Sequence, residues 1–280
     1  RGGIVRRDHT ATVVSIGQGM QRRLLVNGIS ITYLTPITKV MAHLPLAYCE
    51  GKPQSALVIC LGMGTTYRSL LSWDVNTTAA ELVPSVKNAL GYYVDDAESL
   101  SRNPKGRIVI DDGRRFLNRT AERFDVITVD PPPPVEAAGS SLLYSEEFYR
   151  VAKARLNKGG IFHQWFPGGE PKIMQAIARS LSNSFPYVRA YVSLEDCGLH
   201  FIASTRPLAA MTPGVMISRM PDKAKRDILE WSQGRDLNDF VKDILRREVP
   251  FSGLLSNDKA ITISDDRPYN EYYVLRRIRG

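Results

Sequence analysis

The sequence predicts an α/β fold in which a doubly wound, mostly parallel sheet follows a small β domain. From residue 55 onward, short apolar runs alternate with helix-compatible segments, as in successive βαβ units. Before that point, β-branched runs such as ATVVSIG and RRLLVNGISITYL are separated by turn residues. We therefore expect a small β domain in residues 1–50 and a larger domain, with a C-terminal helical region and tail, in residues 51–280.

The first run of the larger domain, ALVICLG, is apolar throughout and ends in glycine, as expected for a strand buried on both faces. Further strands are expected at 77–83, 107–111, 124–130, 159–166, 187–195 and 199–204, and helices at 66–73, 112–120, 145–156, 171–183 and within 219–246. The short connection between the last two strands favours an antiparallel hairpin at one edge. The tail ISDDRPYNEYYVLRR has no clear assignment, and its Asp265 and Asp266 are expected to be solvated.

The composition narrows the classes of function. The net charge is +8, but the basic residues are spread along the chain, so we expect a general basic surface and no nucleic-acid partner. Cys49, Cys60 and Cys197 lie far apart without a CxxC pair, which indicates a reduced, cytoplasmic compartment and no metal site. No stretch approaches the ~20 apolar residues that cross a bilayer.

Residues with binding chemistry follow the first two strands of the larger domain, and ligands of such folds bind outside the carboxyl ends of the strands. Gly62 and Gly64 stand between a strand and a helix, where they allow a ligand to approach the backbone, although ordinary turns have the same pattern. Glu81 ends the second strand. In this register it is expected to bind ribose hydroxyls, whereas alone it would be a solvated charge.

The next two strands also end in carboxylates. Asp111 or Asp112 closes the third strand, and Asp112 with Gly113 is placed to contact an adenine amino group or to cap the following helix. Asp130 closes the fourth strand and is followed by prolines at 131–134, which can continue neither a helix nor a sheet. At this place Asp130 can act as a base or stabilise a sulfonium.

Together these residues resemble a class I S-adenosylmethionine-binding fold, and more narrowly the spermidine synthase family of aminopropyltransferases, over about residues 8–205. The similar segments are MAHLPLAYCEGKPQSALVICLGMG, ELVPSV, DDGRRFLNRTAERFDVITVD and LLYSEEFYRVAKARLNKGGIFHQW. The resemblance implies a Rossmann-like fold that takes S-adenosylmethionine or its decarboxylated form and no metal. It implies Asp130 as the catalytic residue, and as cofactor-binding residues Gly62, Gly64, Thr65, Glu81, Asp112, Gly113 and Asp130.

The chain departs from the family pattern at two positions. Thr65 replaces the aspartate that recognises the amine of the decarboxylated cofactor, and Pro133 replaces the aspartate that holds the polyamine. Loss of one charge-assisted hydrogen bond removes about 1.5–3 kcal/mol of binding. We therefore expect intact S-adenosylmethionine as the substrate. Its own carboxylate would attack the γ-carbon and give homoserine lactone and 5′-methylthioadenosine, a cyclotransferase or lyase reaction.

Three alternatives stay open. The first is the family activity, aminopropyl transfer to a polyamine, with Tyr144, Gln164 or Glu170 holding the amine and His163 as a further substrate-side candidate. The second is methyl transfer, because DPPP resembles the signature of amino-methyltransferases, although Pro133 replaces the stacking aromatic. The third is a nucleotide-binding domain without catalysis.

Three of these side chains also have a structural interpretation. Tyr144 precedes Ser145, which is placed to cap the next helix. Strand alternation can turn His163 either into the packing of the sheet or towards the site, and Gln164 matches the family position. His43, in AHLPL, is expected to be a packed or capping residue rather than a catalyst.

The resemblance also implies partners. One branch of the family carries this domain behind membrane helices, and this chain starts with Arg1, so we expect the cytoplasmic domain of an integral membrane protein. A homodimer and a small-molecule substrate are implied as well.

Overall fold

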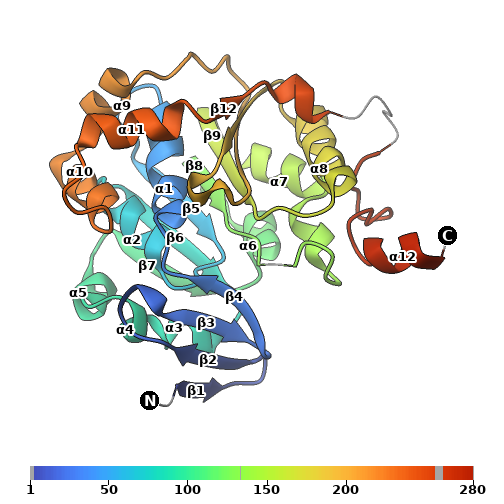
Figure 1. The fold of residues 1–280 in the computed structure, drawn as a ribbon, viewed down its shortest axis with the longest axis horizontal. Helices are drawn as coiled ribbons and strands as arrows, with labels where there is room; N and C mark the ends of the chain where they lie inside the picture. The colour runs from blue at the N-terminus through green and yellow to red at the C-terminus, as the bar shows by residue number, and fades with distance from the viewer. Residues whose placement is uncertain (1–2, 133, 256–260, 280) are drawn as a thin grey trace.

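The computed structural model describes residues 3–132, 134–255 and 261–279 and contains two sheets (Figure 1). The first is antiparallel, in the order β1-β2-β3-β4. Its strands are β1 Ile4–Arg7, β2 Thr12–Ile16, β3 Arg23–Val26 and β4 Ile29–Tyr33. The strands of the second sheet are β5 Ser55–Ile59, β6 Asn76–Glu81, β7 Gly106–Ile110, β8 Phe124–Val129, β9 Leu156–Phe166, β10 Tyr187–Val192, β11 Leu199–Ser204 and β12 Glu248–Val249.

The larger sheet has the order β12-β10-β11-β9-β8-β5-β6-β7. Strands β5 to β9 run parallel to one another, and the β10–β11 hairpin pairs antiparallel with β9. This topology confirms the predicted doubly wound, mostly parallel fold and its antiparallel edge hairpin. The strand order reverses direction at β5, so the crevice for a ligand lies beside the end of that strand.

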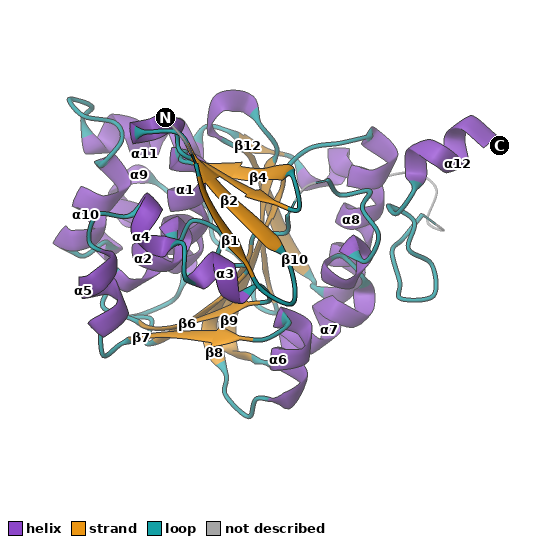
Figure 2. Cartoon of the chain, turned by 90° about the horizontal axis from the view of Figure 1, so that it is seen from below, coloured by secondary structure: helices purple, strands orange, loops and turns teal. Residues whose placement is uncertain are grey.

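Helices cover both faces of this sheet (Figure 2). The cluster of buried side chains on one face includes residues from α1, α2, α9, α10 and α11, and the cluster on the other includes residues from α6, α7 and α8. The helices are α1 Pro36–Tyr48, α2 Thr65–Leu71, α3 Pro84–Lys87, α4 Leu90–Tyr93, α5 Ala97–Arg102, α6 Gly113–Arg119, α7 Glu146–Ala154, α8 Pro171–Ser184, α9 Pro213–Arg219, α10 Asp222–Leu229, α11 Leu237–Leu245 and α12 Tyr273–Arg279.

Helix α1 was not foreseen in the sequence, which was interpreted as β structure up to residue 50. The strands of the first sheet end at Tyr33, and Thr35 then caps α1 by accepting a hydrogen bond from the Ile37 amide at 3.2 Å. Pro36 suits the first helical position because its missing N–H would be unsatisfied there. Since α1 packs into the core of the larger sheet, the β structure is confined to Ile4–Tyr33. The boundary at residue 50 stays a prediction.

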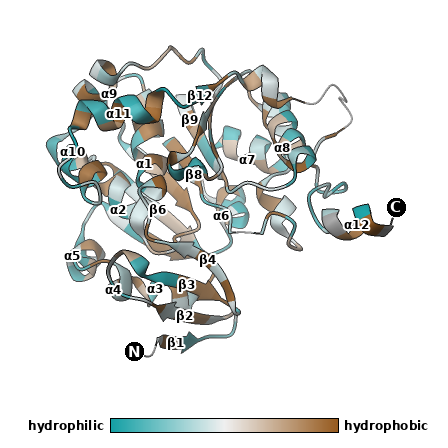
Figure 3. Ribbon diagram, viewed as in Figure 1, coloured by the Kyte–Doolittle hydropathy of each residue, from teal (hydrophilic) through white to brown (hydrophobic). Residues whose placement is uncertain are grey.

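The central strands are apolar because helices shield them from water on both sides. Ala56, Leu57, Val58 and Ile59 of β5 are all buried, and Figure 3 shows hydrophobic colour in the strands at the centre and mixed colour on the outer helices. Each Å² of apolar surface removed from water contributes roughly 25 cal/mol, so burial of these strands against the helices stabilises the fold. No helix in the described ranges is long and apolar enough to cross a bilayer.

The C-terminal tail is part of the fold. Asp265 was expected to be solvated, but Arg114 on α6 donates two hydrogen bonds to its carboxylate, at 2.7 and 2.6 Å. The hydroxyl of Ser145 donates a third, at 2.8 Å. Asp265 is nevertheless exposed, as expected, although charge alone did not reveal a partner that lies 151 residues away in sequence. Asp266 is exposed, as expected.

Candidate active site

The parallel strands bring the four predicted strand ends to one edge of the sheet. Ile59, the last residue of β5, is opposite Ala80 of β6 and Val129 of β8, and Glu81 is opposite Ile110 of β7. The glycine loop, Glu81, Asp112 and Asp130 therefore follow neighbouring strands at the same edge. This is where ligands bind in doubly wound folds.

The loop after β5 needs glycine at Gly64. Its φ of 82° lies in the left-handed region, and a Cβ atom there would stand 2.5 Å from Cδ2 of Leu90. Gly62 has a φ of 55°, and Thr65, which begins α2, is buried. The loop is therefore a compact turn that keeps side chains away from its backbone, as a nucleotide-binding turn requires.

Glu81 holds this loop in place by hydrogen bonds to backbone amides. Its Oε2 accepts a hydrogen bond from the Leu61 amide at 2.8 Å, and its Oε1 accepts one from the Val83 amide at 2.9 Å. Burial raises the pKa of the Glu81 carboxyl, and the hydrogen bonds from the backbone amides oppose that rise. Each carboxylate oxygen can accept more than one hydrogen bond, so the predicted ribose contact is compatible with this arrangement. It stays a prediction.

Asp112 caps helix α6, as the sequence allowed, since its Oδ1 accepts a hydrogen bond from the Arg115 amide at 2.7 Å. The next residue, Gly113, lies so close to β5 that a Cβ atom would stand 2.3 Å from Cγ2 of Ile59. The helix therefore begins directly beside the end of β5. This places Asp112 at the same edge as the glycine loop, where its predicted adenine contact would have to be made.

Asp130 differs from the other carboxylates. Its backbone amide is fixed by a 3.1 Å hydrogen bond to the Ile59 carbonyl, yet its carboxylate has no hydrogen-bond partner among the described residues. Burial, and then the negative charge of Glu81, raise the pKa of the Asp130 carboxyl to about 7. A partly exposed carboxyl with such a pKa is equipped to take up a proton near neutral pH. Of the following prolines, Pro133 lies outside the described residues.

Gln164 and His163 are both occupied by the protein. The hydroxyl of Tyr149 donates to Gln164 Oε1 at 2.6 Å, and Gln164 Nε2 donates to the Leu143 carbonyl at 2.7 Å. The Thr128 hydroxyl donates its proton to the Met41 carbonyl, so it must accept a hydrogen bond from His163 Nδ1, which lies 2.6 Å away. The other ring nitrogen, His163 Nε2, lies 3.1 Å from His200 Nδ1. Burial lowers the pKa of His163 well below its usual value. Each polar atom of the two side chains therefore has a partner within the protein, and their substrate-side role stays a prediction.

Tyr144 is a further substrate-side candidate. It is fully buried, and its hydroxyl has no hydrogen-bond partner in the described structure. Burial raises its pKa well above the usual value, and the charges of Tyr149 and Asp130 add to this. The neighbouring Ser145 caps α7 by accepting from the Phe148 amide at 3.2 Å, as expected. The hydroxyl of Tyr144 is thus unpaired, and its substrate-side role stays a prediction.

Glu195 is a carboxylate that the sequence analysis missed. Leu199, the first residue of β11, is opposite Phe166, the last residue of β9, so the hairpin that carries Glu195 lies at the same edge as Asp130. Glu195 has a φ of 63°, and it accepts hydrogen bonds from the Tyr33 hydroxyl at 3.2 Å and the Thr35 hydroxyl at 3.3 Å. The predicted hairpin was a usable signal, because an antiparallel pair next to β9 must turn at this edge.

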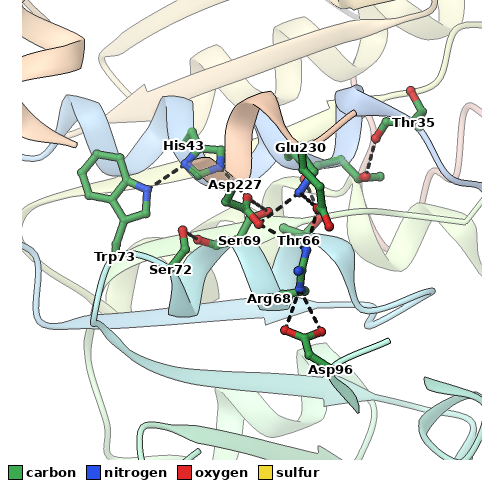
Figure 4. Close-up of polar contacts among 12 residues, drawn as sticks. Thr35, His43, Thr66, Arg68, Ser69, Ser72, Trp73, Asp96, Asp227 and Glu230 are labelled. Atoms are coloured by element: carbon green, nitrogen blue, oxygen red, sulfur yellow. Dashed lines mark hydrogen bonds and ion pairs between the residues drawn. The ribbon is translucent and has the colours of Figure 1, made fainter. Parts of the chain in front are cut away.

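Away from this edge, a polar network joins α1, α2 and α10 (Figure 4). The indole of Trp73 donates to His43 Nδ1 at 2.8 Å, which leaves the proton of the neutral ring on Nε2, 2.8 Å from Asp227 Oδ2. Burial lowers the pKa of His43. Lys39, with a side chain only 1% exposed, pairs with Asp227 at 3.0 Å and with Glu230 at 2.7 Å. His43 is therefore a packed residue, as expected.

Comparisons with known proteins, first of structure and then of sequence, agree with this geometry. The fold is that of class I S-adenosylmethionine-dependent enzymes. A spermidine synthase from Thermotoga maritima superposes with a TM-score of 0.63 at 21% identity, over 80% of this chain and 86% of that one. Human methyltransferase-like protein 13 superposes with a TM-score of 0.58 at 15% identity, over 72% and 95%.

The sequence then places the chain within this class. Residues 35–195 match the Spermine/spermidine synthase domain, and the chain belongs to that family. A polyamine aminopropyltransferase of Thermococcus kodakarensis is 38% identical over 132 residues, which are 44% of this chain and 45% of the relative. Polyamine aminopropyltransferase 1 of Pseudomonas aeruginosa is 28% identical over 163 residues, 56% of each protein. The chain thus spans about half the length of the curated relatives that it matches.

Proposed function

We propose that this protein transfers an aminopropyl group from decarboxylated S-adenosylmethionine to an amine and releases 5′-methylthioadenosine, with Asp130 as the general base. The observation that carries the proposal is the carboxylate of Asp130, which has no partner among the described residues and a pKa raised to about 7. An amine acceptor is protonated at neutral pH and must lose a proton before it can attack. Lactone closure needs no base, because the attacking carboxylate is already ionised.

The proposed step is balanced as follows. The acceptor ammonium gives its proton to Asp130, and the freed nitrogen lone pair attacks the carbon next to sulfur. The carbon–sulfur bond breaks, and its electron pair stays on sulfur as a neutral thioether. The positive charges of sulfonium and ammonium lower the pKa of Asp130 when both substrates are bound, which keeps the base ionised before the transfer.

The substrates would be bound by the groups at the strand ends. The glycine loop with Gly62, Gly64 and Thr65 would lie against the bound sulfonium substrate. Glu81 is the proposed ribose contact, and Asp112 is the proposed adenine contact. Glu195 and the unpaired hydroxyl of Tyr144 are the candidates for the acceptor side, where the family aspartate is replaced by Pro133.

A second candidate is lactone closure of intact S-adenosylmethionine. Thr65 and Pro133 favour it, because both replace aspartates that the family uses for cationic groups. A threonine next to the bound substrate does not repel a carboxylate, and a proline does not hold an ammonium. The two candidates share the site and the product methylthioadenosine, and they differ in the nucleophile.

Product analysis with three substrate mixtures separates these reactions. The protein is incubated with decarboxylated S-adenosylmethionine plus putrescine, with S-adenosylmethionine alone, and with S-adenosylmethionine plus nucleic acid. Methylthioadenosine in the first mixture supports aminopropyl transfer, and in the second it supports lactone closure. S-adenosylhomocysteine in the third would establish a methyltransferase. Binding of methylthioadenosine without turnover in any mixture would overturn the proposal in favour of a non-catalytic domain.

The expected membrane fusion, cytoplasmic location and homodimer stay predictions. None of them affects the reaction proposed at the strand ends. Size determination of the purified chain tests the dimer, and the mass of the protein isolated from its source cells tests the fusion.

A further inference from the structure

The loop that follows Asp130 and its prolines is held by the far end of the chain. Asn270 is fully buried, and its Nδ2 donates to the Val135 carbonyl at 2.6 Å and to the Ser140 hydroxyl at 2.8 Å. The Ser140 hydroxyl in turn donates to the Val135 carbonyl at 2.7 Å. One asparagine side chain therefore closes the turn of this loop.

The residues after Asn270 add two more contacts. Glu271 Oε1 accepts hydrogen bonds from the Ser141 amide at 3.1 Å and from the Ser141 hydroxyl at 2.5 Å. The Tyr272 amide donates to the Glu136 carbonyl at 3.0 Å. Each contact joins residues about 130 positions apart in sequence. The loop between residues 135 and 141 is thus bound to the tail as well as to its own neighbours in sequence.

The same tail also fixes the helices on either side of the site. Asp265 accepts from Arg114, two residues after the cap Asp112 of α6, and from Ser145, the cap of α7. The Ile263 carbonyl accepts from the Glu146 amide at 3.0 Å, and Ile263 is fully buried. One segment therefore connects the predicted adenine side of the site with the helix that follows Tyr144.

We propose that the tail segment Ile263–Tyr272 is the positioning element of the catalytic loop, with Asn270 as its main contact. Asp130 is fixed by the sheet, and Val135 is held by Asn270. The sequence between them is prolines, whose rings fix φ and leave few ways to connect the two ends. The position at which Asn270 holds Val135 therefore determines the path of the chain next to Asp130. This inference rests on the proposed function for its kinetic part only.

The test compares Asn270→Ala with Asp266→Asn in the complete chain. The first variant removes both donors to the loop. The second changes an exposed residue of the same tail and serves as the matched control. Hydrogen exchange is measured by mass spectrometry on peptides that cover residues 135–145 and, for reference, residues 65–71. Methylthioadenosine binding and aminopropyl transfer are measured on the same samples.

Asn270→Ala should speed exchange in residues 135–145 by about tenfold or more, while residues 65–71 and the control variant match the wild type. Turnover should fall about tenfold or more, and the affinity for methylthioadenosine should change less than about twofold, because misplacement near the chemistry affects rate more than binding. Unchanged exchange in residues 135–145, or equal losses of binding and turnover, would overturn the proposal.

Two further outcomes are separated by this design. If Asn270→Ala does not fold, Glu271→Gln keeps the shape of the side chain, removes only its charge and should give a smaller change in the same peptide. If the wild type shows no turnover with any substrate, the proposed function fails. The exchange measurement then still decides whether Asn270 holds the loop.

Discussion

The backbone amide of Leu61 donates a hydrogen bond to the carboxylate of Glu81 at 2.8 Å, so the glycine loop after β5 is fastened to the end of the neighbouring strand β6. The second oxygen of Glu81 accepts from Val83 at 2.9 Å. One buried carboxylate therefore fixes the loop next to the site and is also the predicted ribose contact. If Glu81 binds ribose as predicted, stability and nucleoside binding are coupled at this residue.

Glu81→Gln should weaken both properties. The amide NH₂ cannot accept a hydrogen bond, so one of the two backbone donors loses its partner, at a cost of about 1–3 kcal/mol. We expect a lower free energy of unfolding in urea and weaker binding of methylthioadenosine by calorimetry. Glu98→Gln, on the exposed face of α5, is the control and should change neither. Wild-type binding in Glu81→Gln would contradict the ribose role.

Gly64→Ala should destabilise the glycine loop. The left-handed φ of 82° is strained for alanine, and a Cβ atom there would have to displace Leu90 Cδ2, which lies 2.5 Å away. We expect a loss of roughly 1–3 kcal/mol in the free energy of unfolding. The control is Gly214→Ala in α9, where a Cβ atom meets nothing within 4 Å and alanine should stabilise the helix by up to about 1 kcal/mol. Equal thermal melting temperatures of the two variants would refute the explanation.

The activity should depend on pH through Asp130. Its carboxyl must be ionised to accept a proton and has a pKa of about 7, so kcat/KM should rise with pH through an ionisation near 7. Asp130→Asn should lower kcat by about 10²–10⁴-fold. A pH profile that is flat between about 5 and 9 would show that this group is not the base.

The same group makes a prediction about stability. The folded-state pKa of Asp130, about 7, lies above the ordinary aspartate pKa of 3.8, so the folded protein binds a proton more tightly than the unfolded chain. The stabilising contribution of Asp130 is complete below the unfolded pKa and is lost as the pH rises through the folded pKa. Asp130→Asn should therefore raise the melting temperature more at pH 8 than at pH 4. An equal shift at both pH values would contradict this assignment.

The buried network of Figure 4 should matter for stability rather than for chemistry. Asp227→Ala leaves Lys39 without one of its two carboxylate partners and removes the partner of His43. Breaking a buried ion pair in this way typically lowers the free energy of unfolding by about 3–5 kcal/mol. Asp222→Asn, on the same helix but with a side chain 82% exposed, is the control. Unfolding in urea measures both. A loss of less than about 1 kcal/mol in Asp227→Ala would show that the network is not important for folding.

The sequence by itself determined the order of strands β5 to β11, the helices α2, α6, α7 and α8 between them, and the residues at the four strand ends. Apolar runs of strand length, glycines at turns and acidic residues after strands are local patterns, and local geometry follows from them. Helix α1 was missed because its residues are buried almost all round, so no polar face marked it as a helix.

Only the tertiary structure decided which of the candidates have free polar atoms. Gln164 and His163 share strand β9 and looked equally available, but partners from α7, β8 and β11 use their side chains. Asp130 stayed unpaired, and its pKa depends on burial and on Glu81 from another strand. The tail residues Asp265 and Asn270 acquired their roles from contacts with segments more than 100 positions away. The physical reason is that burial, hydrogen bonding and charge at a site depend on neighbours in space, and a local pattern does not specify them.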